Sequence, residues 1–219
     1  MVINCKWVEK HLDKEDLVEI EKAVVHAEMK SSGEIVPVLI RRSTPIGHVF
    51  PLLFLSLISF VIVLGFDQKL KYFFDIGWGT EVFVVASLFF ASYFLAKVER
   101  IQRLLTSNYD MNKEVIERAE LEFYQSSIKS TKGQTGILLF VSFMERQAVI
   151  LADKAISAKC SAETWDEVIK ILIEGIKQKN MKVGIISGIN RCGEILAQHL
   201  PASPKNTNEL SNRLVVRDH

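Results

Sequence analysis

The stretch Ser31-Ser-Gly-Glu-Ile-Val-Pro-Val-Leu-Ile40 decides the fold, because one element ends in it and the next begins. Before it, Asp13 is placed to cap a helix whose apolar side chains recur at helical spacing (Leu17, Ile20, Val24 and Ala27). The Ser-Ser-Gly sequence ends that helix, and residues 34–40 predict a strand. Pro37 indicates an edge position or a bulge in this strand, because proline has no N–H to donate.

A strand over residues 34–40 needs a partner, since an isolated strand leaves its backbone groups unsatisfied. The next strand pattern is the apolar run Gly136–Ser142, followed by a turn at 144–146 and a return over 147–151. We therefore expect the first strand to pair with this later hairpin. The residues between them are then an insertion into one domain.

Three further helices are predicted, each with apolar side chains at helical spacing. They cover about 110–125, 161–176 and 181–199, and the last one ends before Pro201. Gly184, Gly188 and Gly193 in the last helix favour close packing against a neighbouring element. This order of elements predicts class α/β, with α+β as the alternative, and a small sheet sandwiched by helices.

Two apolar runs dominate the insertion. Residues 43–66 contain no Asp, Glu, Lys or Arg, and a second uncharged run, 82–96, extends back to Trp78. A helix needs about 20 mostly apolar residues to cross a bilayer, so we expect transmembrane helices over 43–66 and 78–96, joined by a short loop over 67–77. A pair of buried core helices is the alternative, which the all-round apolar character of both runs disfavours.

Charges near the two runs indicate their orientation, because cytoplasmic flanks carry an excess of Lys and Arg. The outer flanks hold more of these residues (Arg41, Arg42, Lys97, Arg100, Arg103) than the loop does (Lys69, Lys71). The sequence therefore predicts an integral protein of the bacterial inner (plasma) membrane, with the soluble domain and both termini in the cytoplasm. The charged N-terminus is unlike a cleavable signal peptide, and three unpaired cysteines suit a reducing compartment.

The charge balance of the chain constrains its partners. Its 219 residues include 27 Lys and Arg against 26 Asp and Glu, which gives a net charge of +1 and argues against a nucleic-acid partner. The mean hydropathy of +0.18 is high for a chain in which 24% of residues are charged, and the two apolar runs account for it. A lipid bilayer and an unidentified membrane protein are the expected partners.

Standard catalytic motifs are missing from the sequence. No P-loop, dinucleotide fingerprint or nucleophile elbow occurs, and the three Cys and five His show no metal-ligand spacing, so we expect no cofactor and assign no catalytic residue. Strand ends are where sites on α/β sheets tend to lie, and the polar residues near strand ends and in the tail are Glu34, Glu145, Arg146, Asp153, Asn208 and Glu209. Solvated turns and helix caps are the alternative interpretation of these six residues.

Several motifs resemble one known family in their order and spacing. Ala27-Glu28 with Ser32-Gly-Glu-Ile-Val36 resembles the opening of the TPM domain, in which a helix ends and a strand begins. Thr135–Ser142 with Glu145-Arg146 resembles that domain's strand hairpin, and Trp165, Cys192-Gly193 and Asn208-Glu209-Leu210 resemble its bacterial membrane-anchored branch. The resemblance divides the soluble part into two segments of a TPM-like domain, 1–42 and 97–202, and a polar tail, 203–219.

The resemblance implies an α/β sandwich that is usually tethered to a membrane and associated with accessory roles at membrane complexes. Some plant members are credited with phosphatase activity, and some members bind divalent ions through acidic loops. The position of such a loop before the last helix holds Met181-Lys182-Val183 here. The first hypothesis is therefore a non-catalytic, membrane-anchored accessory or interaction module. The alternative is a weak phosphohydrolase, in which Glu34, Asp153 or Glu145 holds a divalent metal and Arg146 pairs with phosphate.

Overall fold

A computed structural model describes residues 7–45, 47–65, 78–126, 128–131, 133–202 and 208–218. The chain forms two units. Met1–Ser43 with Met111–His219 builds the first, the sheet unit, and Thr44–Asp110 builds the second, the hairpin unit. The sheet unit is thus made of two segments that the hairpin unit separates in the sequence.

The sheet unit contains four strands in the order β3-β2-β1-β4. β1 (Glu34–Ile40) runs parallel to β2 (Gly136–Ser142) in the register Glu34↔Gly136 to Ile40↔Ser142, and β2 pairs antiparallel with β3 (Gln147–Ala152). The prediction that the first strand pairs across the insertion is confirmed, as is a mixed α/β fold. The polar tail, for which no strand was predicted, contains β4 (Val215–Arg217), parallel to β1.

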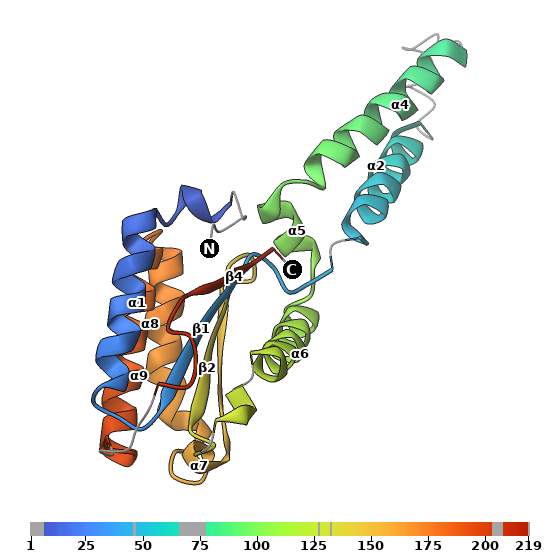
Figure 1. The fold of residues 1–219 in the computed structure, drawn as a ribbon. Helices are drawn as coiled ribbons and strands as arrows, with labels where there is room; N and C mark the ends of the chain where they lie inside the picture. The colour runs from blue at the N-terminus through green and yellow to red at the C-terminus, as the bar shows by residue number, and fades with distance from the viewer. Residues whose placement is uncertain are drawn as a thin grey trace. The chain divides into compact units, whose positions relative to one another are not determined.

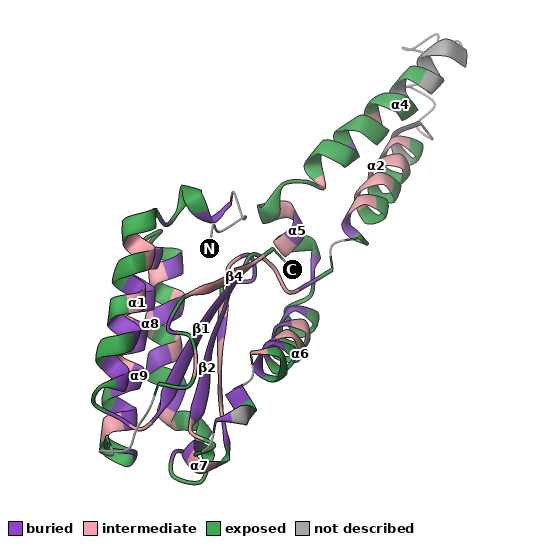
Figure 2. Cartoon of the chain, in the orientation of Figure 1, coloured by how far each residue is buried: buried purple, intermediate pink, exposed green. Residues whose placement is uncertain are grey.

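Helices cover both faces of this sheet (Figure 1). α1 (Lys14–Glu28), α8 (Asp166–Lys177) and α9 (Met181–His199) share one apolar core with Ile35, Leu39 and Leu139. α6 (Asn108–Gln125) lies on the other face, where Val115 and Ala119 pack with alternate residues of β1 and β2. Every residue of β1 and β2 is consequently buried, and both strands are coloured as buried along their length in Figure 2. A strand buried on both faces is apolar throughout rather than alternating, which explains the sequence of each.

Shorter elements complete the described chain. They are η1 (Val8–Lys10), α5 (Glu99–Leu105), η2 (Ile128–Ser130), α7 (Lys154–Ser157) and η3 (Ala162–Trp165). The helix cap predicted at Asp13 is confirmed, because its Oδ1 accepts the backbone N–H of Asp16 at 2.7 Å while Asp16 Oδ2 accepts that of Asp13 at 3.0 Å. Reciprocal bonds of this kind satisfy two N–H groups that a helix start leaves free.

Close packing at the glycines of α9 is also confirmed. A Cβ atom at Gly184 would lie 2.7 Å from the Cα of Gly175 in α8, and one at Gly193 would lie 2.6 Å from Ala27 Cβ in α1. The α8–α9 crossing therefore brings two backbones together at Gly175 and Gly184, which any larger side chain would separate.

The hairpin unit contains α2 (Val49–Gly65), α4 (Trp78–Leu95) and α5. Phe89 of α4 meets Phe50 and Phe54 of α2 edge to face, with ring centroids 5.2 and 5.5 Å apart. Such contacts stabilise a helix pair beyond the area they bury. The loop predicted over 67–77, with its aromatic residues and two lysines, lies outside the described residues.

The prediction of two transmembrane helices is not supported. In the part of the chain that the structure describes, no helix combines the length and the apolar character needed to cross a membrane. The first helix begins at Val49 rather than Ser43, and its 17 residues rise about 25 Å, short of a hydrocarbon core of about 30 Å. The second has 18 residues, and Glu81 is one of them.

Candidate functional site

One side of β1 is only partly covered by a neighbouring strand. β2 pairs along the whole of β1, whereas β4 pairs only with residues 38–40. On the half without a strand, the backbone N–H of Ile35 donates to Glu28 Oε1 at 2.8 Å, and Pro37 has no N–H to satisfy. Pro37 predicted an edge position or a bulge. β1 is instead an inner strand of the sheet, but its half with Pro37 has no partner strand on this side, where the Glu28 carboxyl group accepts the N–H of Ile35.

The same carboxyl group holds the C-terminal segment, residues 208–217. Asn212 Nδ2 donates to Glu28 Oε2 at 2.8 Å, and Asn208 Nδ2 donates to Asn212 Oδ1 at 2.7 Å. Nearby, Glu34 Oε2 accepts the backbone N–H of Leu210 at 3.3 Å. The structure thus brings three of the six predicted site residues into one region: Glu34, Asn208 and Glu209.

Burial dominates the electrostatics of this region. It raises the pKa of Glu28 to about 8, the nearby charge of Glu34 acts in the same direction, and the bonds from Ile35 and Asn212 oppose it. Burial also raises the pKa of Glu34, and the backbone N–H groups of Leu210 and Glu209 oppose that rise. At neutral pH Glu28 therefore keeps its proton. A neutral acid beside a second carboxyl group could exchange a proton with a substrate. Glu28 and Glu34 are only 8% and 3% exposed, however, so a substrate in solution cannot reach them.

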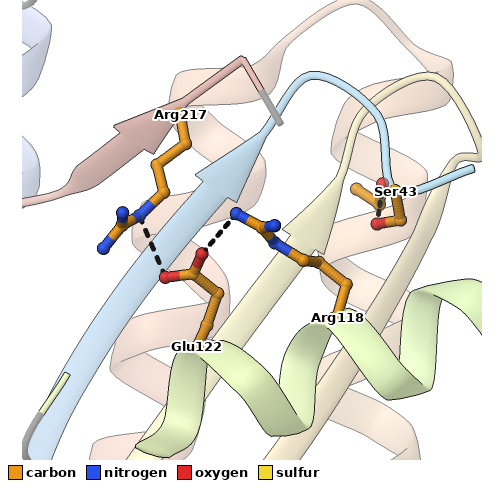
Figure 3. Close-up of polar contacts among 5 residues, drawn as sticks. Ser43, Arg118, Glu122 and Arg217 are labelled. Atoms are coloured by element: carbon orange, nitrogen blue, oxygen red, sulfur yellow. Dashed lines mark hydrogen bonds and ion pairs between the residues drawn. The ribbon is translucent and has the colours of Figure 1, made fainter. Parts of the chain in front are cut away.

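A second buried glutamate, Glu122, lies on the opposite face of the sheet and binds two arginines (Figure 3). Its side chain is 0% exposed; Arg118 Nη2 donates to Oε1 at 2.7 Å, and Arg217 Nε forms an ion pair with Oε2 at 3.0 Å. Glu122 occupies a position on the apolar face of α6, near Val115 and Ala119. The positive charges of the two guanidinium groups offset a carboxylate that would otherwise be strongly unfavourable inside the protein, and they tie α6 to β4.

Glu145 closes the turn between β2 and β3. The backbone N–H of Ser43 donates to Oε1 at 3.1 Å, and the Ser142 hydroxyl donates to Oε2 at 2.6 Å. The Ser43 hydroxyl lies 2.9 Å from that of Ser142. Because Glu145 is 1% exposed, its bonds hold the end of β1 against the turn.

The remaining predicted residues lie at different ends of the sheet. Arg146, exposed in the same turn, has a left-handed backbone with φ 54°. Asp153 follows β3 at the opposite end of the sheet, where Glu34 begins β1. There the backbone N–H of Asp153 donates to Gly136 O, and its Oδ1 accepts the N–H of Lys154. Seven-residue strands separate these ends by about 20 Å, so Glu145 and Arg146 cannot share one ligand with Glu34.

No group of three His, Cys, Asp or Glu side chains is placed to hold a metal ion among the residues that the structure describes. The sequence reasoning missed Glu28, Glu122, Asn212 and Arg217. A signal existed for the two glutamates, because each falls on the apolar face of its helix: Glu28 lies four residues after Val24, and Glu122 lies three residues after Ala119.

A family model described as the TPM domain matches residues 99–195. Residues 99–195 of this chain are similar to the TPM domain. The match confirms the family suggested by the sequence motifs, and it runs from α5 into α9. It omits α1, β1 and the C-terminal segment, although β1 forms the centre of the same sheet with β2. The contacts of Glu28 and Glu34 thus lie outside the matched residues.

One solved structure is similar over nearly the whole chain. It is the NMR structure of BA42 protein from the psychrophilic bacterium Bizionia argentinensis, with a TM-score of 0.59, 21% identity, and coverage of 97% of this chain and 100% of that chain. At this identity the likeness concerns the fold alone. Among curated proteins, none matches the chain.

Proposed function

We propose that this chain is a non-catalytic accessory module of a bacterial inner-membrane complex, whose hairpin unit inserts into the bilayer and holds the TPM domain there. The observation that carries the proposal is the outer surface of α2 and α4. Large apolar side chains are exposed on both helices, including Leu55 at 62%, Phe83 at 72% and Phe94 at 64%. α4 is coloured as exposed over most of its described length in Figure 2.

Exposed apolar surface of this extent is unfavourable in water and marks a lipid-facing or protein-facing surface. The residues of α2 and α4 already contact each other through Phe50, Phe54 and Phe89, so the exposed side chains lie outside that contact. The absence of Asp, Glu, Lys and Arg from residues 43–66 favours lipid over a protein surface, because protein interfaces carry polar rims.

The non-catalytic part of the proposal is supported by the buried acids. Glu28, Glu34, Glu122 and Glu145 each accept bonds from the protein itself. A phosphohydrolase would need several acids open to metal and phosphate on one side of the sheet. Glu145 lies at the opposite end of the sheet from Glu34 and Asp153, and all three side chains are buried. No observation in the described residues favours that alternative.

Membrane extraction of the full chain tests the proposal. We expect the protein to remain in the membrane fraction after alkaline carbonate washing. The double variant Leu55→Lys/Phe83→Lys places charges on exposed apolar positions of both helices, and we expect it to be released into the supernatant.

The matched control is Met29→Lys/Val183→Lys, which changes two exposed apolar residues of the sheet unit. It should remain membrane-bound like the unmodified chain. Release of the unmodified chain by carbonate would contradict insertion.

Reporter fusions at the C-terminus address the orientation, and an external reporter would contradict the cytoplasmic placement inferred from Lys and Arg.

A further inference from the structure

α5 has the reverse of the usual arrangement of polar and apolar side chains. Gln102 in α5 and Thr106 immediately after it are buried, at 4% and 7% exposure, while Leu104 is 82% exposed. Val98 at the start of α5 and Leu105 at its end are also exposed. A surface helix of a water-soluble protein turns its apolar side inward, so the outward side of α5 suits an apolar environment.

Polar bonds within the hairpin unit fix this orientation. Gln102 Nε2 donates to the carbonyl oxygen of Ala96 at 2.7 Å, which ties α5 to the end of α4. The Thr106 hydroxyl donates to Gln102 O at 2.8 Å and lies 3.5 Å from His48 Nε2, next to the start of α2. The exposure of Leu104 is therefore imposed by bonds at both ends of the helix.

Cations accompany the exposed apolar side chains. Lys97, Arg100 and Arg103 lie within or next to α5, against the single acid Glu99. Lys97 Nζ is 4.1 Å from the ring centroid of Tyr93, at the end of α4. Aromatic rings and Lys or Arg side chains whose stems cover apolar surface are typical of the boundary between lipid tails and headgroups.

We propose that α5 lies in the headgroup layer of the bilayer, where Leu104 enters the tail boundary and Lys97 and Arg100 bind anionic phospholipid headgroups. The inference rests on the membrane role proposed above and names the lipid class. Two features favour lipid over an acidic protein as the partner. First, α5 directly follows α4, whose surface is apolar. Second, α5 combines the exposed Leu104 with neighbouring cations, as helices at the membrane interface do.

Flotation of the full chain with vesicles tests the proposal. One set of vesicles contains phosphatidylcholine alone, and the other contains phosphatidylcholine and phosphatidylglycerol in equal amounts. We expect tighter binding to the second set, weakened by added salt. The variant Lys97→Gln/Arg100→Gln should lose about fivefold in affinity for anionic vesicles for each cation removed, with no loss on neutral vesicles.

The control Lys170→Gln/Lys177→Gln removes the same charge from exposed positions of α8 in the sheet unit, and it should bind like the unmodified chain. Equal binding of the unmodified chain to both vesicle sets, or an unchanged anionic preference in Lys97→Gln/Arg100→Gln, would overturn the assignment of α5. Failure of the unmodified chain to bind either set would instead overturn the membrane role itself. Unchanged melting temperatures confirm that the variants fold.

Discussion

At the scale of single residues, three buried glutamates share one feature: each contacts the C-terminal segment. Glu28 accepts from Asn212, Glu34 accepts from Leu210, and Glu122 pairs with Arg217. β4 itself is only partly buried at all three positions. Polar contacts from both faces of the sheet therefore hold this segment together with the partly buried apolar residues Leu210, Leu214, Val215 and Val216.

The raised pKa of Glu28 gives a pH dependence with a definite sign. In the unfolded chain Glu28 loses its proton near pH 4.5, whereas in the folded protein it keeps the proton up to about pH 8. The folded state thus binds more protons across this window, so the free energy of unfolding falls as pH rises. We expect Glu28 to contribute a slope of up to about 1.4 kcal/mol per pH unit, measured by urea unfolding.

Glu28→Gln removes the titrating group and should reduce this dependence between pH 4.5 and about 8, leaving the part that comes from Glu34, whose pKa burial also raises. Glu15→Gln, on the exposed side of the same helix, is the control and should retain the full slope. A slope as steep in Glu28→Gln as in the unmodified chain would mean that Glu28 does not carry it.

Replacing Glu122 by Ala tests the pairing with arginine. The change leaves Arg118 and Arg217 without their shared carboxylate. Because both arginines stay partly exposed to water, we expect a loss of about 2 kcal/mol in unfolding free energy, as for hydrogen bonds to charged groups. The control Glu117→Ala removes an acid from the same helix, but its pair with Lys113 is exposed and contributes about 0.5 kcal/mol. Equal losses of unfolding free energy in the two variants would contradict a special role for Glu122.

The sequence revealed part of this polar arrangement. Glu34 was predicted as a site residue because it lies at the end of a predicted strand, whereas Glu28 and Glu122 were not predicted as site residues. Their partners could not be found, since Asn212 and Arg217 lie in a tail without hydrophobic periodicity. Only the parallel pairing of β4 with β1 brings those partners to the glutamates.

At the scale of elements, the strength of the apolar pattern decided what could be predicted. Residues 35–40 and 137–141 are uninterrupted apolar runs, and both lie in strands with the expected pairing. β4 has three residues, too few for a period to emerge. α5 was missed for a different reason, because its outward apolar side chains do not follow the pattern of a helix packed on a sheet.

The α8–α9 crossing makes a prediction at this scale. Gly184→Ala would place a Cβ atom 2.7 Å from the Cα of Gly175, so the two helices must move apart. Alanine favours the helix by about 1 kcal/mol, but overpacking costs about 1–3 kcal/mol. Since the opposing atom is backbone, which yields less than a side chain, we expect a net loss of about 1 kcal/mol in unfolding free energy.

Gly47→Ala is the matched control, because a Cβ atom there meets nothing within 4 Å. Its unfolding free energy should equal that of the unmodified chain. A Gly184→Ala variant as stable as this control would show that the crossing accommodates a methyl group.

At the scale of the whole molecule, the chain leaves the sheet unit after β1, builds the hairpin unit, and returns through α6 to β2. Parallel strands require a long crossover in any case, so the hairpin unit occupies a connection that the sheet already needs. The register of β1 with β2 is set by seven residue pairs and by apolar cores on both faces. Apart from Ile128 and the residues of α6, none of the buried residues in those two cores belongs to the connection.

This arrangement predicts that the sheet unit folds without the hairpin unit. Replacing residues 44–107 by a flexible Gly/Ser linker keeps β1, α6 and β2, as well as the Ser43–Glu145 bond. Changing the length of a flexible connection costs little free energy, about 0.6 kcal/mol per doubling, so we expect one cooperative urea transition and loss of membrane binding. A non-cooperative transition would show that the sheet depends on the hairpin unit, whereas retained membrane binding would move the lipid contact to the TPM domain itself.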